Sequence, residues 1–189
     1  MRAPTPDVYF DRCWGGSDDP WAHARRWSET RKYRLTVAAL PRLHYRRSFE
    51  PGCGIGVLTT LLAARSVEHL AMERHERGVA ATRERCAALP EVTVAQGRIP
   101  DDWPEGSFDL VVLSEVLYYL SADEMDDALE RVEASLAPEG DLVAVHYRPV
   151  VPEHAWTGDE VHDRLRARPG WTGLSRIVED DFVLDVLRR

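Results

Sequence analysis

The feature that most constrains the fold is a glycine-rich segment in the first third of the chain. It reads Glu50-Pro51-Gly52-Cys53-Gly54-Ile55-Gly56 and lies between a short apolar run and the start of a helical pattern. Alternate glycines carry no Cβ, so the backbone can pass close to a ligand. A strand, such a turn and a helix are the first unit of a parallel α/β sheet. We therefore predict that a ligand binds where this turn leaves the sheet.

The chain after Arg47 alternates short apolar runs with longer amphipathic segments, which is typical of βαβ units. We predict strands at about 48–50, 68–72, 92–95, 110–113 and 142–145. We predict helices at about 57–65, 76–88 and 122–136. The tail is predicted to form a β-hairpin from 171–178 and 182–187. The expected fold class is α/β, a doubly wound, Rossmann-like, mostly parallel seven-stranded sheet that ends in this antiparallel hairpin.

The segment before this pattern differs in character. Residues 1–18 are short, polar and turn-rich, and Asp19-Pro20 has the residue types of a helix start. The helix is expected to run from Trp21 to Leu40, where a following proline ends it. The length of 189 residues suits one domain. We expect a single domain, 1–189, with an N-terminal lid and helix in 1–45 and the Rossmann-like core in 46–189.

Composition excludes several classes of protein. The net charge of -8 argues against a nucleic-acid partner, because phosphate binding needs clustered positive charge. No apolar run approaches the roughly 20 residues that cross a bilayer, and the start lacks a signal peptide, so a cytoplasmic location without membrane contact is expected. The three cysteines form no regular pair and the histidines lack metal-ligand spacing, so we expect neither disulfide nor metal. Lys32, the only lysine, we attribute to coding bias.

A carboxylate follows the second predicted strand at Glu73, where it can accept both hydrogen bonds of a ribose diol. The turn has G-x-G-x-G spacing rather than the G-x-G-x-x-G of dinucleotide-binding folds, which disfavours a nicotinamide-dependent dehydrogenase. Glu50 and Glu73 would border the turn with two negative charges, which repel a pyrophosphate but suit an ammonium and a sulfonium. The predicted cofactor is therefore S-adenosylmethionine. The alternative is that the glycines form only a tight connection.

Further segments narrow this prediction to a family. They are Phe108–Leu120 (FDLVVLSEVLYYL), Leu136–Gly140 (LAPEG), and upstream Asp19-Pro20-Trp21 with Glu29 and Arg31. With the glycine turn, they resemble class I S-adenosylmethionine-dependent methyltransferases over about Arg47 to the end, and among these the NodS-like nodulation N-methyltransferases. The acceptor in that family is a deacetylated amino sugar at the end of a chitooligosaccharide.

The resemblance implies roles for individual residues. The backbone of 52–56 would contact the methionine part of the cofactor, Glu73 the ribose and Arg98-Ile99 the adenine. The family usually has Asp where Arg98 stands; arginine cannot accept a hydrogen bond, so its backbone or a stacked guanidinium would have to substitute. The N-terminal segment would cover the cofactor as a lid, and Arg31 would bind the cofactor carboxylate through two hydrogen bonds. The expected cofactor-binding residues are Glu50, Gly52, Cys53, Gly54, Gly56, Glu73, Arg74, Arg98, Ile99, Ser114, Tyr9, Trp21 and Arg31.

Candidate catalytic residues follow the fourth and fifth predicted strands, at the edge where open α/β sheets bind ligands. Glu115 either orients an acceptor amine or caps the following turn. One of Tyr118 and Tyr119 is expected to face the pocket, unless both only cover the core. His146 is the candidate base, whereas His154 and His162 lie in a polar stretch and are expected to be solvated.

The predicted activity is methyl transfer from S-adenosylmethionine to an amine of a small-molecule acceptor, through proximity and exclusion of water. O-methylation is the first alternative, and a base would then matter more. A catalytically silent, methyltransferase-like binding module is the second, and the intact glycine turn with Glu73 argues against it. The sequence does not indicate the oligomeric state.

Overall fold

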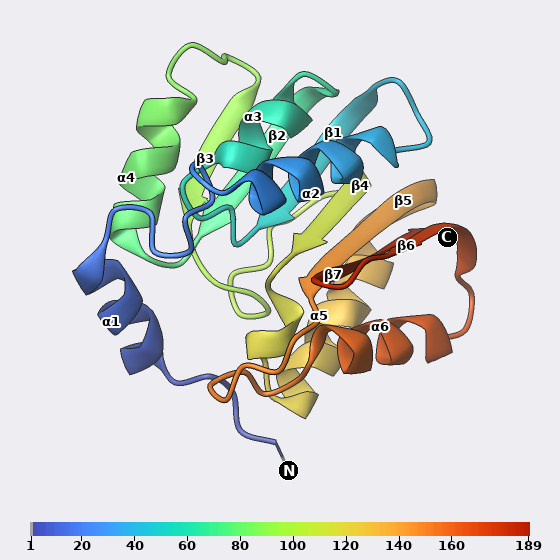
Figure 1. Ribbon diagram of the computed structural model, residues 1–189. Coiled ribbons are helices and arrows are strands. Elements are labelled where there is room, and N and C mark those ends of the chain that lie inside the picture. Colours follow the sequence, from blue (N-terminus) through green and yellow to red (C-terminus); the bar gives the residue numbers. More distant parts are fainter. Residues whose placement is uncertain (1) are drawn as a thin grey trace.

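One seven-stranded sheet, in the order β3-β2-β1-β4-β5-β7-β6, forms the centre of the protein in the computed structural model, which describes residues 2–189 (Figure 1). Strands β1 to β5 pair in parallel, and β7 is antiparallel to both β5 and β6. This confirms the predicted fold class. The strands are β1 Tyr45–Pro51, β2 Ser66–Glu73, β3 Val92–Gln96, β4 Phe108–Ser114, β5 Leu136–Tyr147, β6 Thr172–Val178 and β7 Phe182–Arg188.

Helices cover both faces of the sheet (Figure 1). One face carries α2 (Trp27–Ala38), α3 (Val57–Ala63) and α4 (Glu76–Arg85), and α3 contacts both of its neighbours. The other face carries α5 (Ala122–Ser135) and α6 (Gly158–Ala167). No helix among residues 2–189 is long and apolar enough to cross a membrane. The sheet is therefore the middle of three layers, with the carboxyl ends of β1 to β5 at one edge.

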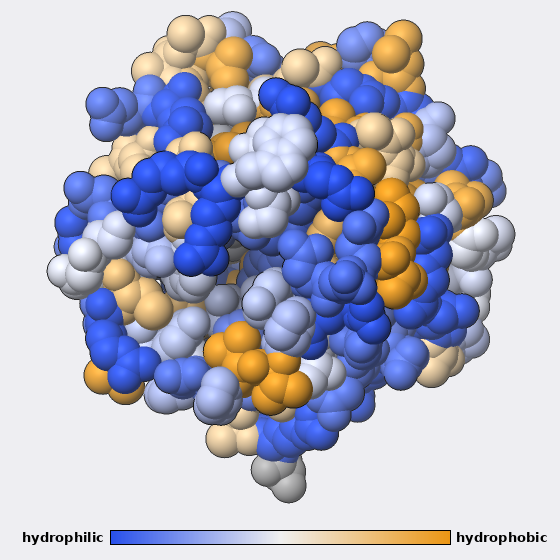
Figure 2. Space-filling view, viewed as in Figure 1, coloured by the Kyte–Doolittle hydropathy of each residue, from blue (hydrophilic) through white to orange (hydrophobic). Residues whose placement is uncertain are grey.

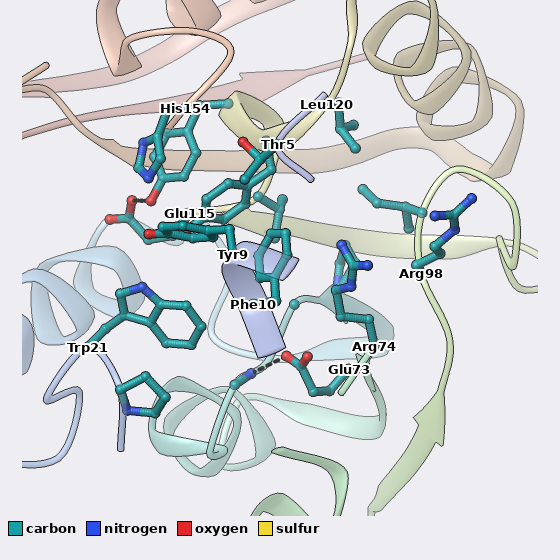
Figure 3. A pocket seen from close by; sticks show the side chains of 18 of the residues that line it. Thr5, Tyr9, Phe10, Trp21, Glu73, Arg74, Arg98, Glu115, Leu120 and His154 are labelled. Atoms are coloured by element: carbon teal, nitrogen blue, oxygen red, sulfur yellow. Dashed lines mark hydrogen bonds between the residues drawn. The ribbon is translucent and has the colours of Figure 1, made fainter. Parts of the chain in front are cut away.

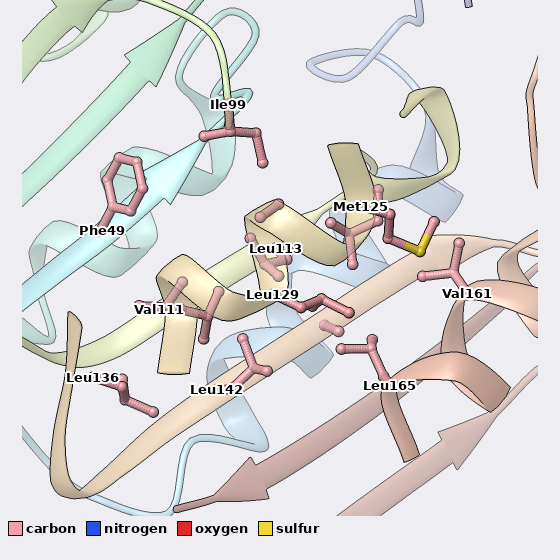
Figure 4. Close-up of a cluster of buried hydrophobic side chains, with 14 of the residues drawn as sticks. Phe49, Ile99, Val111, Leu113, Met125, Leu129, Leu136, Leu142, Val161 and Leu165 are labelled. Atoms are coloured by element: carbon pink, nitrogen blue, oxygen red, sulfur yellow. The ribbon is translucent and has the colours of Figure 1, made fainter. Parts of the chain in front are cut away.

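Both faces of β4 are buried. Its successive side chains point to opposite faces of the sheet, and helices cover each face. Val111 and Leu113 pack with α5 and α6, where Leu129 and Leu165 lie in the same cluster (Figure 4). Leu110 belongs to the cluster on the opposite face, under α2 and α3. The apolar run of β4 is continuous because its side chains fill one core on each face of the sheet.

The N-terminal part differs from the sequence-based expectation. Residues expected to be a polar turn contain the helix α1 (Asp7–Gly16), which buries Phe10 and Trp14 one turn apart. The helix expected from Trp21 begins only at Trp27. The Asp19 carboxylate accepts hydrogen bonds from the backbone N–H groups of His23 and Ala24 and forms a turn instead of a helix cap.

Sequence analysis also missed α6. Thr157 and Glu160 form a capping box at its start, and Val161 and Leu165 are buried on its inner face. The polar and proline-containing residues before it concealed this short amphipathic helix. The segment around Leu136–Gly140, expected to end α5, begins β5, because Leu136 pairs with Phe108.

Candidate active site

The glycine turn opens into a cavity of about 460 Å³. Its walls come from the carboxyl ends of β1 to β4, from α1 and from the segment before α2 (Figure 3). The order of the strands reverses between β1 and β4, and such switch points are where doubly wound sheets bind ligands. Figure 2, viewed from the same side as Figure 1, shows this face hollowed near its centre, with hydrophilic residues along much of the border.

The glycine turn is shaped for a close approach of its backbone to a ligand. Gly52 and Gly54 line the cavity with φ of 73° and 59°. A Cβ on Gly52 would lie 2.2 Å from Cγ1 of Val116, and a Cβ on Gly54 would lie 3.2 Å from the His23 ring. Both positions need a residue without a side chain. Gly56 is the N-cap of α3, and the structure places it outside the cavity wall.

Glu73, at the end of β2, is buried and faces the turn. Its Oε2 accepts a hydrogen bond from the Gly54 N–H at 2.9 Å (Figure 3), and its Oε1 accepts one from the His75 N–H at 2.9 Å. Burial raises the pKa of Glu73, and these two N–H donors oppose that rise. The carboxylate is therefore fixed in orientation and lines the cavity, as recognition of a ribose diol requires.

Several residues expected at the cofactor are buried behind the cavity wall. Glu50 accepts a hydrogen bond from Thr59 Oγ1 at 2.7 Å and contacts Nε2 of His69 at 3.2 Å, so its carboxylate belongs to a buried network. Cys53 is buried against Thr82, and burial raises the pKa of its thiol. Ser114, at the end of β4, is also buried away from the cavity. These residues therefore pack on the core side of the glycine turn, away from the cavity.

The cavity continues beyond Glu73 toward the end of β3. Arg74, Arg98 and Ile99 line this end. The Arg74 guanidinium lies over the Phe10 ring, 4.3 Å from the centre of that ring. Arg98 donates to Asp101 through Nε at 2.8 Å. The end of the cavity where the resemblance places adenine is thus bordered by two arginines.

The N-terminal segment covers the cavity. Tyr9 and Trp21 line it as expected, and Phe10 joins them (Figure 3). Trp14 stacks on His75 with ring centres 5.1 Å apart, which docks α1 on the start of α4.

Arg31 lies elsewhere than predicted. It donates to Glu179 at 2.8 Å and is outside the cavity wall, because its position on α2 faces the β6–β7 hairpin. Arg26, at the N-cap of the same helix, lines the cavity instead. Within residues 2–189 its guanidinium has no carboxylate partner within 4 Å. Arg26 is therefore better placed than Arg31 to bind a carboxylate of the cofactor.

An ion cluster forms the other end of the cavity. The Lys32 ammonium lies 2.5 Å from Oε1 of Glu115 and 2.9 Å from Oε2 of Glu29. The Tyr118 hydroxyl donates to Oε2 of Glu115 at 2.5 Å, and the Tyr147 N–H donates to the same oxygen at 2.9 Å. The Glu115 carboxylate therefore holds Lys32 and Tyr118 together at this end of the cavity, and it does not cap the turn that follows it. Lys32, which the sequence analysis attributed to coding bias, is the cation of this cluster.

The charges of this cluster stabilise one another. Burial opposes ionisation of Glu115, but the attraction of Lys32 and the hydrogen bonds of Lys32 and Tyr118 lower its pKa to about 2. Burial also opposes the charged form of Lys32, and the two carboxylates outweigh it and raise the Lys32 pKa. Both groups stay charged at neutral pH.

His146 is fully buried and does not line the cavity. Its Nε2 accepts a hydrogen bond from the Leu117 N–H at 3.2 Å, and its Nδ1 contacts His162 Nε2 at 3.1 Å. Burial lowers the pKa of His146 well below its usual value. Both nitrogens are engaged, so the expected role as a base in contact with the acceptor is not supported. His162 is fully buried too and bonds Asp185, contrary to the expected solvation.

Three rings face the cavity: the two tyrosines that the sequence analysis left open, and His154, which it expected to be solvated. Tyr118 and Tyr119 both line it, where only one was expected to do so. His154 also lines it and stacks on Tyr118 with ring centres 4.2 Å apart. Burial lowers the pKa of His154, which keeps the imidazole neutral near pH 7. Among the residues that the structure describes, no group of three or more His, Cys, Asp or Glu could hold a metal ion.

Comparison with known proteins agrees with this geometry. A family model described as a methyltransferase domain matches residues 49–142. Nodulation protein S from Sinorhizobium fredii is 26% identical over 129 residues, which cover 67% of this chain and 60% of that protein. The corresponding protein from Rhizobium tropici is 28% identical over 129 residues, 67% of this chain and 54% of that one. The matched part thus spans less than two thirds of these curated relatives.

Solved structures show the same relationship over more of the chain. A putative methyltransferase from Pseudomonas syringae is 40% identical with a TM-score of 0.77, covering 87% of this chain and 100% of that one. The N-methyltransferase NodS from Bradyrhizobium japonicum, in complex with S-adenosyl-L-homocysteine, shares the fold with a TM-score of 0.86 at 23% identity, covering 96% and 97%.

The doubly wound fold, the glycine turn and Glu73 define a class I methyltransferase site. The chain belongs to the S-adenosylmethionine-dependent methyltransferases, and the nodulation proteins S are among its relatives. The predicted enzyme class and cofactor are thereby confirmed. The glycine turn that lines the cavity and the fixed Glu73 carboxylate both fit that cofactor.

Proposed function

We propose that this protein transfers the methyl group of S-adenosylmethionine to an amine nitrogen of a small-molecule acceptor. The observation that carries the proposal is the ionised Glu115 carboxylate, which Lys32 and Tyr118 hold at the end of the cavity. S-adenosylmethionine supplies an electrophilic methyl group when bound. The remaining task of the protein is to align the acceptor and to exclude water.

The balance of charge at this end favours an amine. Glu29 and Glu115 contribute two negative charges and Lys32 contributes one positive charge, so the cluster has a net charge of about -1. Such a site attracts an ammonium group and orients the amine after it loses its proton. The amine proton can leave to water, so no protein base is required. A deacetylated amino sugar, as the resemblance implies, presents such an amine next to hydroxyl groups.

O-methylation stays a second candidate because of His154. A hydroxyl acceptor needs a base near the nucleophile, and the neutral His154 imidazole lines the cavity beside Tyr118. The two candidates make opposite demands on these side chains. An amine acceptor depends on Glu115, whereas a hydroxyl acceptor depends on His154.

The test is methyl transfer from radiolabelled S-adenosylmethionine to glucosamine, to deacetylated chitooligosaccharides and to the matched N-acetylated sugars. We expect label on the free amines and none on the acetylated sugars. Glu115→Gln should then reduce kcat/KM about 100-fold, and His154→Phe less than tenfold. Label on the acetylated sugars, abolished by His154→Phe, would favour O-methylation. Calorimetric binding of S-adenosylmethionine without transfer to any acceptor would favour the binding module.

A further inference from the structure

The end of the cavity near β3 must recognise a base whose amino group donates hydrogen bonds, if the cofactor is bound as proposed above. Glu73 fixes the ribose end, and the cavity continues from there to Gly97, Arg98 and Ile99 at the end of β3. An amino group needs an acceptor, and arginine side chains offer only donors. Arg74 and Arg98 therefore cannot supply the acceptor through their side chains.

The other carboxylates near this end either lie outside the cavity wall or hold the start of a helix. Asp101 accepts from the Arg98 guanidinium at 2.8 Å, and Asp102 accepts from the Arg98 backbone N–H at 3.0 Å. Neither of them lines the cavity. Glu124 does line it, but its Oε2 closes the capping box of α5 on the Ser121 N–H at 2.8 Å.

Asp7, in the first turn of α1, is differently placed. It lines the cavity, and its Oδ1 accepts from Nη2 of Arg74, whose guanidinium packs on Phe10. Among residues 2–189, Oδ2 of Asp7 has no hydrogen-bond donor. The bond to Arg74 lowers the pKa of Asp7, and the charge of Arg98 acts in the same direction, so the carboxylate is ionised. The side chain is 68% exposed, which leaves Oδ2 open to a ligand.

We propose that Asp7 of the N-terminal helix is the acceptor for the adenine amino group, so that the lid itself contributes base specificity. Arg74 orients the Asp7 carboxylate and presents a flat guanidinium next to it. This assignment rests on the proposed function, because it concerns the same cofactor. It makes α1 part of the recognition site rather than only a cover over it.

The test compares two ligands that differ at one position of the base. S-adenosylhomocysteine carries an amino group, whereas S-inosylhomocysteine carries a carbonyl oxygen there, which a carboxylate repels. Calorimetry should show that the unaltered protein binds the adenosyl compound more tightly. Asp7→Ala should weaken binding of the adenosyl compound roughly tenfold and leave the inosyl compound within about twofold. Asp7→Asn, whose amide can donate, should shift the preference toward the inosyl compound.

A matched control separates recognition from docking of the helix. Asp18 pairs with Arg77, ties the same N-terminal segment to α4 and lies outside the cavity wall. Asp18→Asn should therefore leave the ratio of the two affinities unchanged. Equal losses for both ligands in Asp7→Ala, or loss of the preference in Glu124→Gln instead, would overturn the assignment. If the unaltered protein failed to bind S-adenosylhomocysteine, the proposed function would fail and this inference with it.

Discussion

The ammonium of Lys32 lies 2.5 Å from Oε1 of Glu115 and joins α2 to the loop that follows β4. Lys32 is 4% exposed, so the pair is shielded from water. Glu115 has a φ of 59°, a left-handed conformation that non-glycine residues rarely adopt. Such conformations gather at functional sites, where the surrounding structure holds them in place. The pair therefore links α2 to the proposed acceptor end of the cavity.

Loss of the Glu115 charge should cost stability in a pH-dependent way. The folded-state pKa of about 2 lies below the ordinary value of 4.5, so ionised Glu115 stabilises the fold above about pH 4.5. This contribution disappears as the pH falls through 2. Glu115→Gln should lower the free energy of unfolding by roughly 3 kcal/mol at pH 7. Urea unfolding should show this difference shrinking between pH 4.5 and pH 2.

Glu105 provides the control for that experiment. It is exposed, and within residues 2–189 its carboxylate makes no ion pair. Glu105→Gln should change the free energy of unfolding by less than about 0.5 kcal/mol at any of these pH values. A loss in Glu115→Gln that stays constant from pH 7 to pH 2 would contradict the assigned role of the charge.

The sequence predicted the parts of the site that depend on local order along the chain. The Gly52–Gly56 turn follows β1 directly and Glu73 ends β2, and parallel pairing brings the ends of those strands to one edge. The role of Lys32 could not be predicted in the same way, because its partner Glu115 lies 83 residues away and only the docking of α2 brings the two together. One lysine among 24 basic residues was nevertheless a signal that sequence analysis set aside.

The misassigned residues have a related cause. His146 follows a buried strand, so its place at the cavity edge was a reasonable expectation. The side chain points to the core side, where α6 supplies His162 as its partner. Because α6 was not predicted, the sequence offered no buried partner for His146. Arg31 lies on α2 and Arg26 is the N-cap residue before it, and only the packing of α2 decides which of them faces the cavity.

Gly54→Val should abolish binding of S-adenosylmethionine while the fold persists. A valine at φ of 59° is strained, and its Cβ would lie 3.2 Å from Nδ1 of His23. Calorimetry should detect no binding, and circular dichroism should show the spectrum of the unaltered protein. Gly173→Val is the matched control, because a Cβ there meets nothing within 4 Å. Unchanged affinity in Gly54→Val would remove the glycine turn from the cofactor site.

Glu73→Ala should weaken cofactor binding by about 1.5 to 3 kcal/mol, the usual contribution of hydrogen bonds to a charged acceptor. The same change frees the Gly54 and His75 N–H groups, which adds to the loss by loosening the turn. Isothermal titration with S-adenosylmethionine measures the effect. Glu76→Ala, at an exposed position three residues later, serves as the control. An affinity of the Glu73 variant within twofold of the unaltered protein would show that no ribose contacts this carboxylate.

Arg26→Ala and Arg31→Ala should differ in their effects on cofactor affinity. Arg26 lines the cavity without an ion-pair partner among the described residues, whereas Arg31 bonds Glu179 outside it. Loss of a charge-assisted bond to the cofactor carboxylate should weaken binding about tenfold for Arg26→Ala. Binding by Arg31→Ala should stay within twofold. The reverse order of affinities would restore the original assignment of Arg31.

The lid should become more rigid when the cofactor binds. Phe10 and Trp14 form with Ile55 a small buried cluster, separate from the two main cores. Ion pairs from Arg74 and Arg77 to α1 and the residues after it are exposed to solvent and add little. A segment with so few buried contacts opens locally at low free-energy cost. Hydrogen exchange in residues 5–30 should therefore be fast in the free protein and slow down with saturating S-adenosylmethionine.

Deletion of residues 1–18 tests the same point by affinity. It removes Tyr9 and Phe10 from the cavity wall and uncovers Ile55, while the contacts among β1, β4 and β5 stay intact. The truncated protein should keep its circular dichroism spectrum and bind S-adenosylmethionine at least tenfold more weakly, because the ligand loses one apolar wall of its site. The alternative is that α1 packs permanently on the sheet edge without touching the cofactor. Hydrogen-exchange rates in residues 5–30 that do not change with S-adenosylmethionine, together with an unchanged affinity after truncation, would establish that alternative and remove Tyr9 from the site.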